Sequence, residues 1–149
     1  MELRRGTPSD LSFVHRSEKR YIEEVEGDRL VAWQGAIERH LDQWVANLPR
    51  TTIAQSRGIR VGYLSWEREG DRAVLASVNV DPSHRRRGVA SGPMKRFEDD
   101  ARTAGCSVAE LGFVSLTPAR HLYEALGYRA TEAVGRYVRM TKLLSGVRP

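Results

Sequence analysis

The segment that decides the fold runs from Val80 to Ser91 and reads VDPSHRRRGVAS. A strand pattern precedes it and helical spacing follows it, so we expect it to form a strand-to-helix loop. The first N–H groups of a helix have no partner inside the helix, and the helix dipole adds partial positive charge there. Three arginines next to Gly88, whose backbone has no side chain to cover it, therefore predict a site for an anion such as pyrophosphate. A solvated basic turn is the alternative interpretation of the same residues.

Strands are predicted on both sides of this loop. Gly and Asp punctuate three β-type runs before it, which we interpret as antiparallel strands joined by tight turns at Arg57-Gly58 and Gly70-Asp71. After it we expect a helix that ends near Gly105. The remaining expected elements are a strand at 107–114, a helix that starts at Thr117-Pro118 and is capped by Gly127, and a closing strand pair at 128–134 and 136–144.

The N-terminal third of the chain has a mainly helical sequence pattern. Residues 1–5 suggest a short strand, and Thr7 to Asp10 form a helix-start signal before an apolar stripe. The acidic run at 21–28 ends in Gly-Asp and is predicted to be a loop. Apolar residues then recur at helical spacing until Pro49 ends the helix.

The sequence therefore predicts a mixed α/β (α+β) fold in one domain, residues 1–149. We expect a mostly antiparallel, twisted sheet of about seven strands, flanked by about four helices. No repeat, linker or low-complexity tract interrupts the chain.

Composition narrows the class of protein further. The 149 residues carry a net charge of +5, which favours anionic ligands but does not identify one. Cys106 is the single cysteine, so an internal disulfide and a cysteine-based zinc site are excluded, and a reducing, cytoplasmic location is expected. His15, His40, His84 and His121 lack metal-ligand spacing, so no metal is expected. No apolar run is long enough for a membrane span.

The loop also resembles a known family signature. The pattern V-x-P-x-x-R-x-x-G-x-A, spelled by Val80, Pro82, Arg85, Gly88 and Ala90, is similar to the acyl-CoA signature of the GCN5-related N-acetyltransferases, the GNAT superfamily. A second segment, TPARHLYEALGY at 117–128, resembles the later motif of that family. One helix and one strand separate the two segments, as in the family.

The resemblance implies roles for individual residues. It implies that the central strand pair splays apart, that the pantetheine arm of acetyl-CoA pairs with backbone there, and that Tyr123 protonates the departing thiolate as general acid. The implied cofactor-binding residues are Val78, Asn79, Val80, Arg85, Arg86, Arg87, Gly88, Val89, Ala90, Ser91, Leu116, Ala119 and Tyr123.

Three positions depart from the family pattern. Leu116 stands where an asparagine is frequent, so that side chain makes no polar contact to the cofactor arm. Pro93 falls near the start of the cofactor helix, where we expect an irregular first turn. Ala76 and Ser77 occupy the strand positions at which many relatives carry a glutamate as a water-mediated base.

Other carboxylates could substitute for that base. The candidate bases are Glu67 on the neighbouring strand and Glu23, Glu24 or Glu26 in the acidic run, and each also fits a solvated surface charge. The acceptor side is predicted to include Tyr63, Trp66, Glu23 and Glu26. The acidic run at 21–28 favours a cationic acceptor such as a small amine, a peptide N-terminus or a lysine.

The expected function is transfer of an acetyl group from acetyl-CoA to a primary amine by direct attack in a ternary complex. Two alternatives stay open: a non-catalytic acyl-CoA-binding or sensing module, and a nucleic-acid binder that uses the arginine run. The arginine run lacks stacking aromatic residues, so no nucleic-acid partner is expected. The final strands could also pair across a homodimer.

Overall fold

The computed structural model describes residues 1–115 and 117–144. Within them lie seven strands and five α-helices, with the strand order β1-β2-β3-β4-β5-β7-β6. The predicted mixed fold with a mostly antiparallel seven-stranded sheet is confirmed, with five helices where about four were expected. The chain divides into two compact units, residues 1–65 with 77–93 and residues 66–76 with 94–149.

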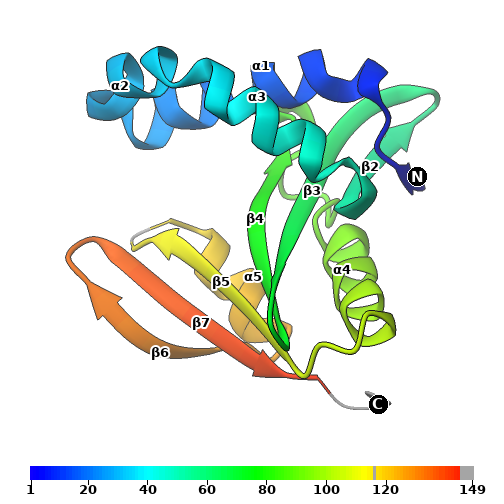
Figure 1. Ribbon diagram of the computed structural model, residues 1–149, viewed down its shortest axis with the longest axis vertical. Helices are drawn as coiled ribbons and strands as arrows, with labels where there is room; N and C mark the ends of the chain where they lie inside the picture. The colour runs from blue at the N-terminus through cyan, green and yellow to red at the C-terminus, as the bar shows by residue number, and fades with distance from the viewer. Residues whose placement is uncertain (116, 145–149) are drawn as a thin grey trace. The chain divides into compact units, whose positions relative to one another are not determined.

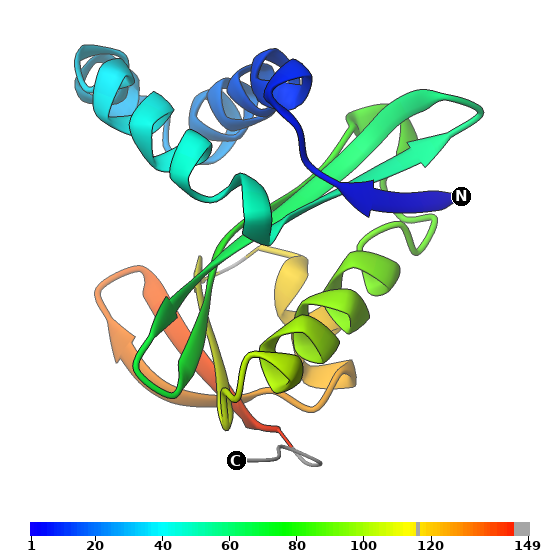
Figure 2. The same cartoon turned by 45° about the vertical axis from the view of Figure 1, so that its right-hand side comes forward.

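Three helices and the first strands make up the first unit. The strands are β1 (Glu2–Arg5), β2 (Thr51–Ser56) and the adjoining parts of β3 (Ile59–Glu69) and β4 (Arg72–Val80). The helices are α1 (Leu11–Val25), α2 (Leu30–Gly35) and α3 (Ile37–Ala46). They form one helical layer beside β2 and β3, coloured blue to cyan in Figures 1 and 2.

The core of the first unit follows the alternation of the strands. Phe13 and Val14 of α1 pack on Ile53 and Tyr63, with Trp44 of α3 at the edge of this cluster. Side chains on a strand alternate between faces, so Ala54, next to Ile53, points to the other face. There it forms a second cluster with Val61 and Val89, and the register of β2 and β3 shifts between Ala54 and Gln55, opposite Val61. Val89 thus places the end of the basic loop against the sheet.

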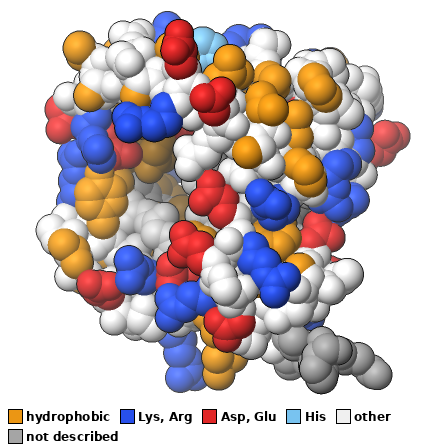
Figure 3. All heavy atoms as spheres, in the orientation of Figure 1, with side chains coloured by type: hydrophobic (Ala, Val, Ile, Leu, Met, Phe, Trp, Pro, Cys, Tyr) orange, Lys and Arg blue, Asp and Glu red, His pale blue; other side chains and the backbone are white. Residues whose placement is uncertain are grey.

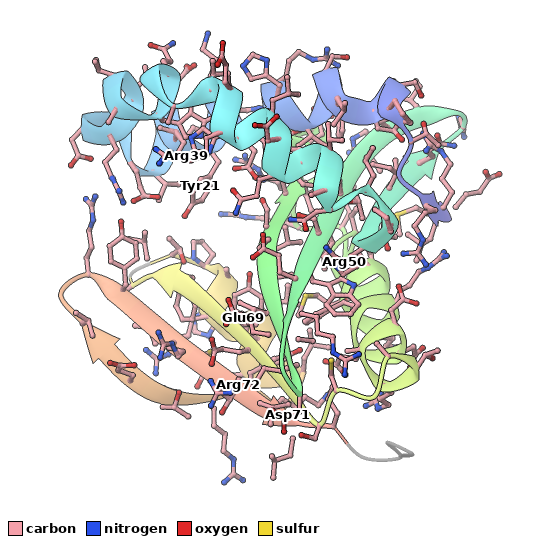
Figure 4. The ribbon with its side chains drawn as sticks, in the orientation of Figure 1. Tyr21, Arg39, Arg50, Glu69, Asp71 and Arg72 are labelled. Atoms are coloured by element: carbon pink, nitrogen blue, oxygen red, sulfur yellow. The ribbon has the colours of Figure 1, made fainter. Side chains whose placement is uncertain are left out.

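Two helix predictions in this unit were wrong. The acidic run predicted as a loop belongs to α1 as far as Val25, because Tyr21, Ile22 and Val25 continue the half-buried stripe of the helix and glutamate is a good helix former. Figure 4 labels Tyr21 among the helices. The helix predicted from residue 30 onward is broken at Ala36, directly after Gly35, a residue with weak helix propensity.

The second unit contains the remaining helices and strands. They are α4 (Ser91–Thr103, of which the unit includes residues 94–103), β5 (Val108–Val114), α5 (Ala119–Ala125), β6 (Arg129–Val134) and β7 (Tyr137–Leu143). β5 and β7 are antiparallel over seven residue pairs, and α5 lies on one side of them (Figure 1). Met94, Phe97 and Ala101 of α4 are fully buried, and the helix ends before Gly105 as predicted.

The central strands β4 and β5 are parallel but pair only briefly. Their ladder consists of three pairs, Arg72 with Val108, Ala73 with Ala109, and Val74 with Glu110. Arg72, labelled in Figure 4, also bonds the carboxylate of Glu110. The β4–β5 ladder ends at Val74, so residues 75–80 of β4 are not part of it.

Candidate cofactor and acceptor site

The loop after β4 is stabilised by its own first residues. Asp81 accepts a hydrogen bond from the backbone N–H of Ser83 at 3.2 Å, and its own N–H donates to the carbonyl oxygen of Val61 at 2.8 Å. Residues Pro82 to His84 form one 3-10 turn. This turn fixes the direction in which the chain leaves the sheet, and the arginines follow directly.

The backbone then takes two left-handed residues. Arg86 has φ of 64° and Gly88 has φ of 73°. A side-chain Cβ at Gly88 would meet no atom within 4 Å, so this position requires glycine for its conformation rather than for space. Such alternating conformations turn successive N–H groups toward one side of a loop, as anion-binding backbone does.

The amides of this loop are open. Among the residues that the structure describes, the backbone N–H groups of Arg86, Arg87, Gly88, Val89 and Ala90 make no hydrogen bond. The next amide, that of Ser91, donates to the carbonyl oxygen of Gly88 at 3.2 Å. The bare amides that pyrophosphate binding requires are therefore present.

The three arginines of the loop differ in their partners. Arg85 pairs with Glu24 of α1 at 3.1 Å and donates to the carbonyl oxygen of Val80 at 3.3 Å. Within residues 1–115 and 117–144, the side chains of Arg86 and Arg87 have no ion-pair or hydrogen-bond partner, and both are exposed. The last two arginines thus provide unneutralised positive charge beside the open amides.

Pro93 is compatible with the start of α4 and costs the helix no hydrogen bond. The helix begins at Ser91, so Pro93 is its third residue. The N–H groups of the first turn have no partner inside a helix, and proline removes none of its hydrogen bonds there. Because the helix starts at Ser91, Pro93 does not force the irregular first turn that was expected from the sequence.

The end of β4 lies close to β3 in the first unit. A Cβ at Gly62 would come within 2.8 Å of the carbonyl oxygen of Asn79, so only glycine fits at that position. Val78, Asn79 and Val80 are all partly exposed. The Asn79 and Ser77 side chains bond each other at 3.1 Å, on the face of the strand that meets Tyr63.

Tyr63 is the centre of a polar network that sequence reasoning did not find. Its hydroxyl donates a very short hydrogen bond to Glu18 of α1, contacts the Ser77 hydroxyl at 2.9 Å, and accepts from Asn79 Nδ2 at 3.2 Å. Burial raises the pKa of Glu18, although the bonds from Ser77 and Tyr63 oppose this effect. Glu18 lies four residues after Val14, on the inner stripe of α1, and this spacing is the signal that could have found it.

The candidate bases from the sequence lie elsewhere. Glu24 is bound to Arg85, and Glu23 faces Lys19 at 4.0 Å. Glu26 is buried at the end of α1, next to Arg29 at 3.5 Å. Glu67 of β3 belongs to the second unit. None of these four carboxylates belongs to the network around Tyr63.

The remaining site residues belong mainly to the second unit. Tyr123 is buried on α5 and packs against Phe113 of β5, with ring centroids 5.5 Å apart. Trp66 packs against Phe97 of α4 at 5.9 Å, whereas Tyr63 contacts α1 in the first unit. Ala119 is the first residue of α5. Leu116 lies outside the described residues.

A separate basic hollow opens in the first unit. It measures about 280 Å³, and its lining includes Arg16, Arg20 and Arg60. Arg20 pairs with Asp81 at 3.3 Å, and Arg60 pairs with the buried Asp10 at 2.7 Å. Two of its three cations are therefore already neutralised by carboxylates.

Neither a metal cluster nor a membrane helix is found in the part of the chain that the structure describes. No group of three or more His, Cys, Asp or Glu side chains there could hold a metal ion. No helix there is long and apolar enough to cross a bilayer.

In the fold, the fourth strand of a seven-stranded mixed sheet leads through a glycine-containing loop with open amides into a helix, an arrangement that can bind an anion. The sequence profile of the acetyltransferase (GNAT) family matches residues 14–128. The chain therefore belongs to the acetyltransferase (GNAT) family.

Solved structures share the fold at low sequence identity. The PaiA N-acetyltransferase of Thermoplasma acidophilum, in complex with coenzyme A, has a TM-score of 0.81 at 13% identity, over 95% of this chain and 98% of that one. The ribosomal-protein-alanine N-acetyltransferase of Brucella melitensis has a TM-score of 0.76 at 22% identity, over 97% and 100%. YncA of Salmonella typhimurium, with acetyl-CoA, has a TM-score of 0.72 at 20% identity, over 97% and 94%. No curated relative matches the chain in sequence.

Proposed function

We propose that this protein transfers an acetyl group from acetyl-CoA to the nitrogen of a primary amine. The observation that carries the proposal is the set of open amides from Arg86 to Ala90 next to two unpaired arginines. Family membership supports acetyl transfer as the reaction class. The pyrophosphate of acetyl-CoA would accept hydrogen bonds from those amides, as anions do at helix N-termini.

The chemistry assigns a role to each part of the chain. The pantetheine arm would pair with the backbone of Val78 to Val80, beyond the end of the β4–β5 ladder. The neutral amine nitrogen would attack the thioester carbonyl carbon, the N–C bond would form and the C–S bond would break. Tyr123 would donate a proton to the departing thiolate, since a phenol with an ordinary pKa of about 10 can protonate a thiolate of about 8.5 in a shared site. The nitrogen would then release its extra proton to give the amide, and Tyr123 would regain a proton from water.

The test is release of free CoA from acetyl-CoA by the purified chain in the presence of primary amines. We expect thiol release that depends on the amine, together with an N-acetylated product detected by mass spectrometry. Tyr123→Phe should lower kcat about 100-fold and leave the Kd for acetyl-CoA nearly unchanged. His121→Phe, an exposed position on the same helix, is the matched control and should retain full turnover.

Two results would contradict the proposal. Tight binding of acetyl-CoA without turnover across small amines, peptide N-termini and lysine peptides would indicate a non-catalytic acyl-CoA-binding module. Absence of acetyl-CoA binding would remove the cofactor assignment itself.

A further inference from the structure

Glu18 is a carboxylate of the first unit surrounded by hydrogen-bond donors. Asn79 Nδ2 donates to Ser77 Oγ at 3.1 Å and to Tyr63 Oη at 3.2 Å. The single proton of Tyr63 goes to Glu18, so it is not available to Ser77 in the 2.9 Å contact between the two hydroxyls. The hydrogen bonds of Tyr63 and Ser77 both lower the pKa of Glu18, so they favour its ionised form.

Glu18 is the group of this network that can act as a base. Serine and asparagine side chains do not titrate in the pH range of an enzyme assay. Burial and the neighbouring Glu18 raise the pKa of Tyr63 well above its usual range, so the phenol stays protonated. Burial also raises the pKa of Glu18 itself, which makes this carboxylate a stronger base than an exposed one.

The network reaches the strand that would hold the cofactor. Ser77 and Asn79 lie on either side of Val78 in β4, and all three residues are partly exposed. Glu18 is half-buried as a residue, and burial is the largest influence on the pKa of its carboxyl. Sequence reasoning found no carboxylate on β4 at Ala76 or Ser77. The hydrogen bonds bring one from α1 to the Ser77 side chain instead.

We propose that Glu18 is the proton acceptor for the amine substrate, and that Tyr63, Ser77 and Asn79 are positioning residues that hold its carboxylate. The proposal rests on the proposed acetyl transfer. An alkyl ammonium ion binds at the carboxylate and gives one proton to Glu18, which frees the nitrogen lone pair for attack. The N–C bond forms and the C–S bond breaks, and the nitrogen then loses its second proton to water to give the amide. The carboxylic acid of Glu18 returns its proton to water, and the thiolate leaves as the thiol. The acceptor class is thus a primary alkyl amine that is protonated in solution.

The pH dependence follows from the groups that face Glu18. These are Tyr63 from β3, Ser77 from β4 and His40 from α3, whose positive charge would lower the pKa of the carboxyl. His40 is stacked between Trp33 and Trp44, with centroids 5.4 and 6.1 Å away. Glu18 acts as a base only when ionised, so kcat/KM should rise with pH through its raised pKa. Removing a donor should move this acidic limb to higher pH.

The first experiment compares Glu18→Gln with the wild-type enzyme from pH 6 to 10, using alkyl amines and a low-pKa amine such as an arylamine. We expect Glu18→Gln to lower kcat/KM for alkyl amines about 100-fold at neutral pH, with recovery as the amine loses its proton unaided. The arylamine is already neutral, so its rate should change less than 3-fold. Glu38→Gln on α3, an exposed carboxylate, is the matched control and should change neither rate.

The second experiment uses Ser77→Ala, which keeps the carboxylate and removes one donor. Its acidic limb should move to higher pH. The inference is overturned if Glu18→Gln matches the wild type for alkyl amines, if both amine classes lose activity equally, or if the Ser77→Ala limb stays in place. A wild-type enzyme that acetylates no amine would instead overturn the proposed function, and the inference with it.

Discussion

Asp10 illustrates how one residue can hold a strand and a helix together. Its carboxylate is fully buried and accepts two hydrogen bonds of 2.8 Å from Arg4 and one of 2.7 Å from Arg60. The backbone N–H of Thr7 adds a fourth bond at 2.8 Å. Burial raises the pKa of this carboxyl, but the four bonds outweigh burial and hold the pKa far below its ordinary value. The carboxylate of Asp10 thus links β1, β3 and the start of α1.

We expect Asp10→Asn to destabilise the chain by about 3 to 5 kcal/mol at neutral pH, because two arginines lose their shared charge partner. A chain of this size should then lose very roughly 6 to 20 °C in Tm. A depressed pKa contributes stability above the ordinary carboxyl pKa, and this contribution is lost as the pH falls through the folded-state value. The difference in free energy of unfolding between the wild type and Asp10→Asn should therefore shrink in acid.

Urea unfolding at pH 7 and pH 3 measures this difference. Asp42→Asn, an exposed carboxylate on α3, serves as the control and should shift the free energy of unfolding by less than about 0.5 kcal/mol. If Asp10→Asn were as stable as the control Asp42→Asn at pH 7, the ion pairs of Asp10 would not stabilise the fold.

Glu18 shows the limit of sequence reasoning at the residue scale. Its spacing from Val14 places it on the inner stripe of α1, but a glutamate in a helix is normally interpreted as solvated. Its partners, Tyr63 and Ser77, lie 45 and 59 residues further along the chain. Local patterns contain no information about such pairs. The loop amides, in contrast, depend on neighbours in sequence, and the predicted loop and helix start are found where Gly88 and the arginines indicated them.

At the scale of elements, the loop between β4 and α4 contains two left-handed residues, Arg86 and Gly88. Gly88 has φ of 73° and open space around its Cα. Alanine in that conformation costs about 1 to 2 kcal/mol, and the loop can relieve this strain by turning its amides away. We expect Gly88→Ala to weaken acetyl-CoA binding about 10-fold, measured by isothermal titration calorimetry.

Gly70 provides the matched control for this loop. It lies in the β3–β4 turn with φ of 62° and equally open space, so Gly70→Ala carries a similar conformational strain. We expect it to lower the Tm but to leave the Kd for acetyl-CoA unchanged. If both variants weaken binding equally, general destabilisation explains the loss and the amides of the loop are not the anion site.

Element boundaries were predictable where turn residues mark them. Gly58, Gly70 and Gly135 all have positive φ and stand at the predicted tight turns of the strands. The end of α1 was missed because the acidic run carries no turn residue before Gly27, and charge alone does not end a helix. Gly and Pro mark turns through their own backbone geometry. Where no such residue stands, the end of an element depends on burial against a strand that is distant in sequence.

At the scale of the whole molecule, the net charge of +5 does not form a general basic surface. On the face that Figure 3 shows, acidic and basic side chains lie intermixed. Many cations are paired, such as Arg139 with Glu132 at 2.8 Å and Lys142 with Glu98 at 2.8 Å. Arg86 and Arg87 have no ion-pair or hydrogen-bond partner among the described residues, as is also true of Arg16, Arg57 and Arg129, but these two adjoin the open amides of the loop. From this arrangement we expect a small polyanion as ligand rather than a long nucleic acid.

That distribution leads to a prediction for the folded chain as a whole. A ligand that binds only the native state stabilises it by about 2.7 kcal/mol at a concentration 100 times its Kd. For a chain of this length, CoA should then raise the Tm by very roughly 5 to 10 °C. Dephospho-CoA keeps the pyrophosphate and should retain most of this shift, whereas pantetheine lacks it and should give little. A single-stranded RNA homopolymer should give none at physiological salt.

Because the stabilisation is assigned to the loop amides, an equal shift with pantetheine would place the binding energy on the arm and contradict the pyrophosphate site. A shift with RNA that excess CoA does not remove would instead favour a nucleic-acid partner for the arginines.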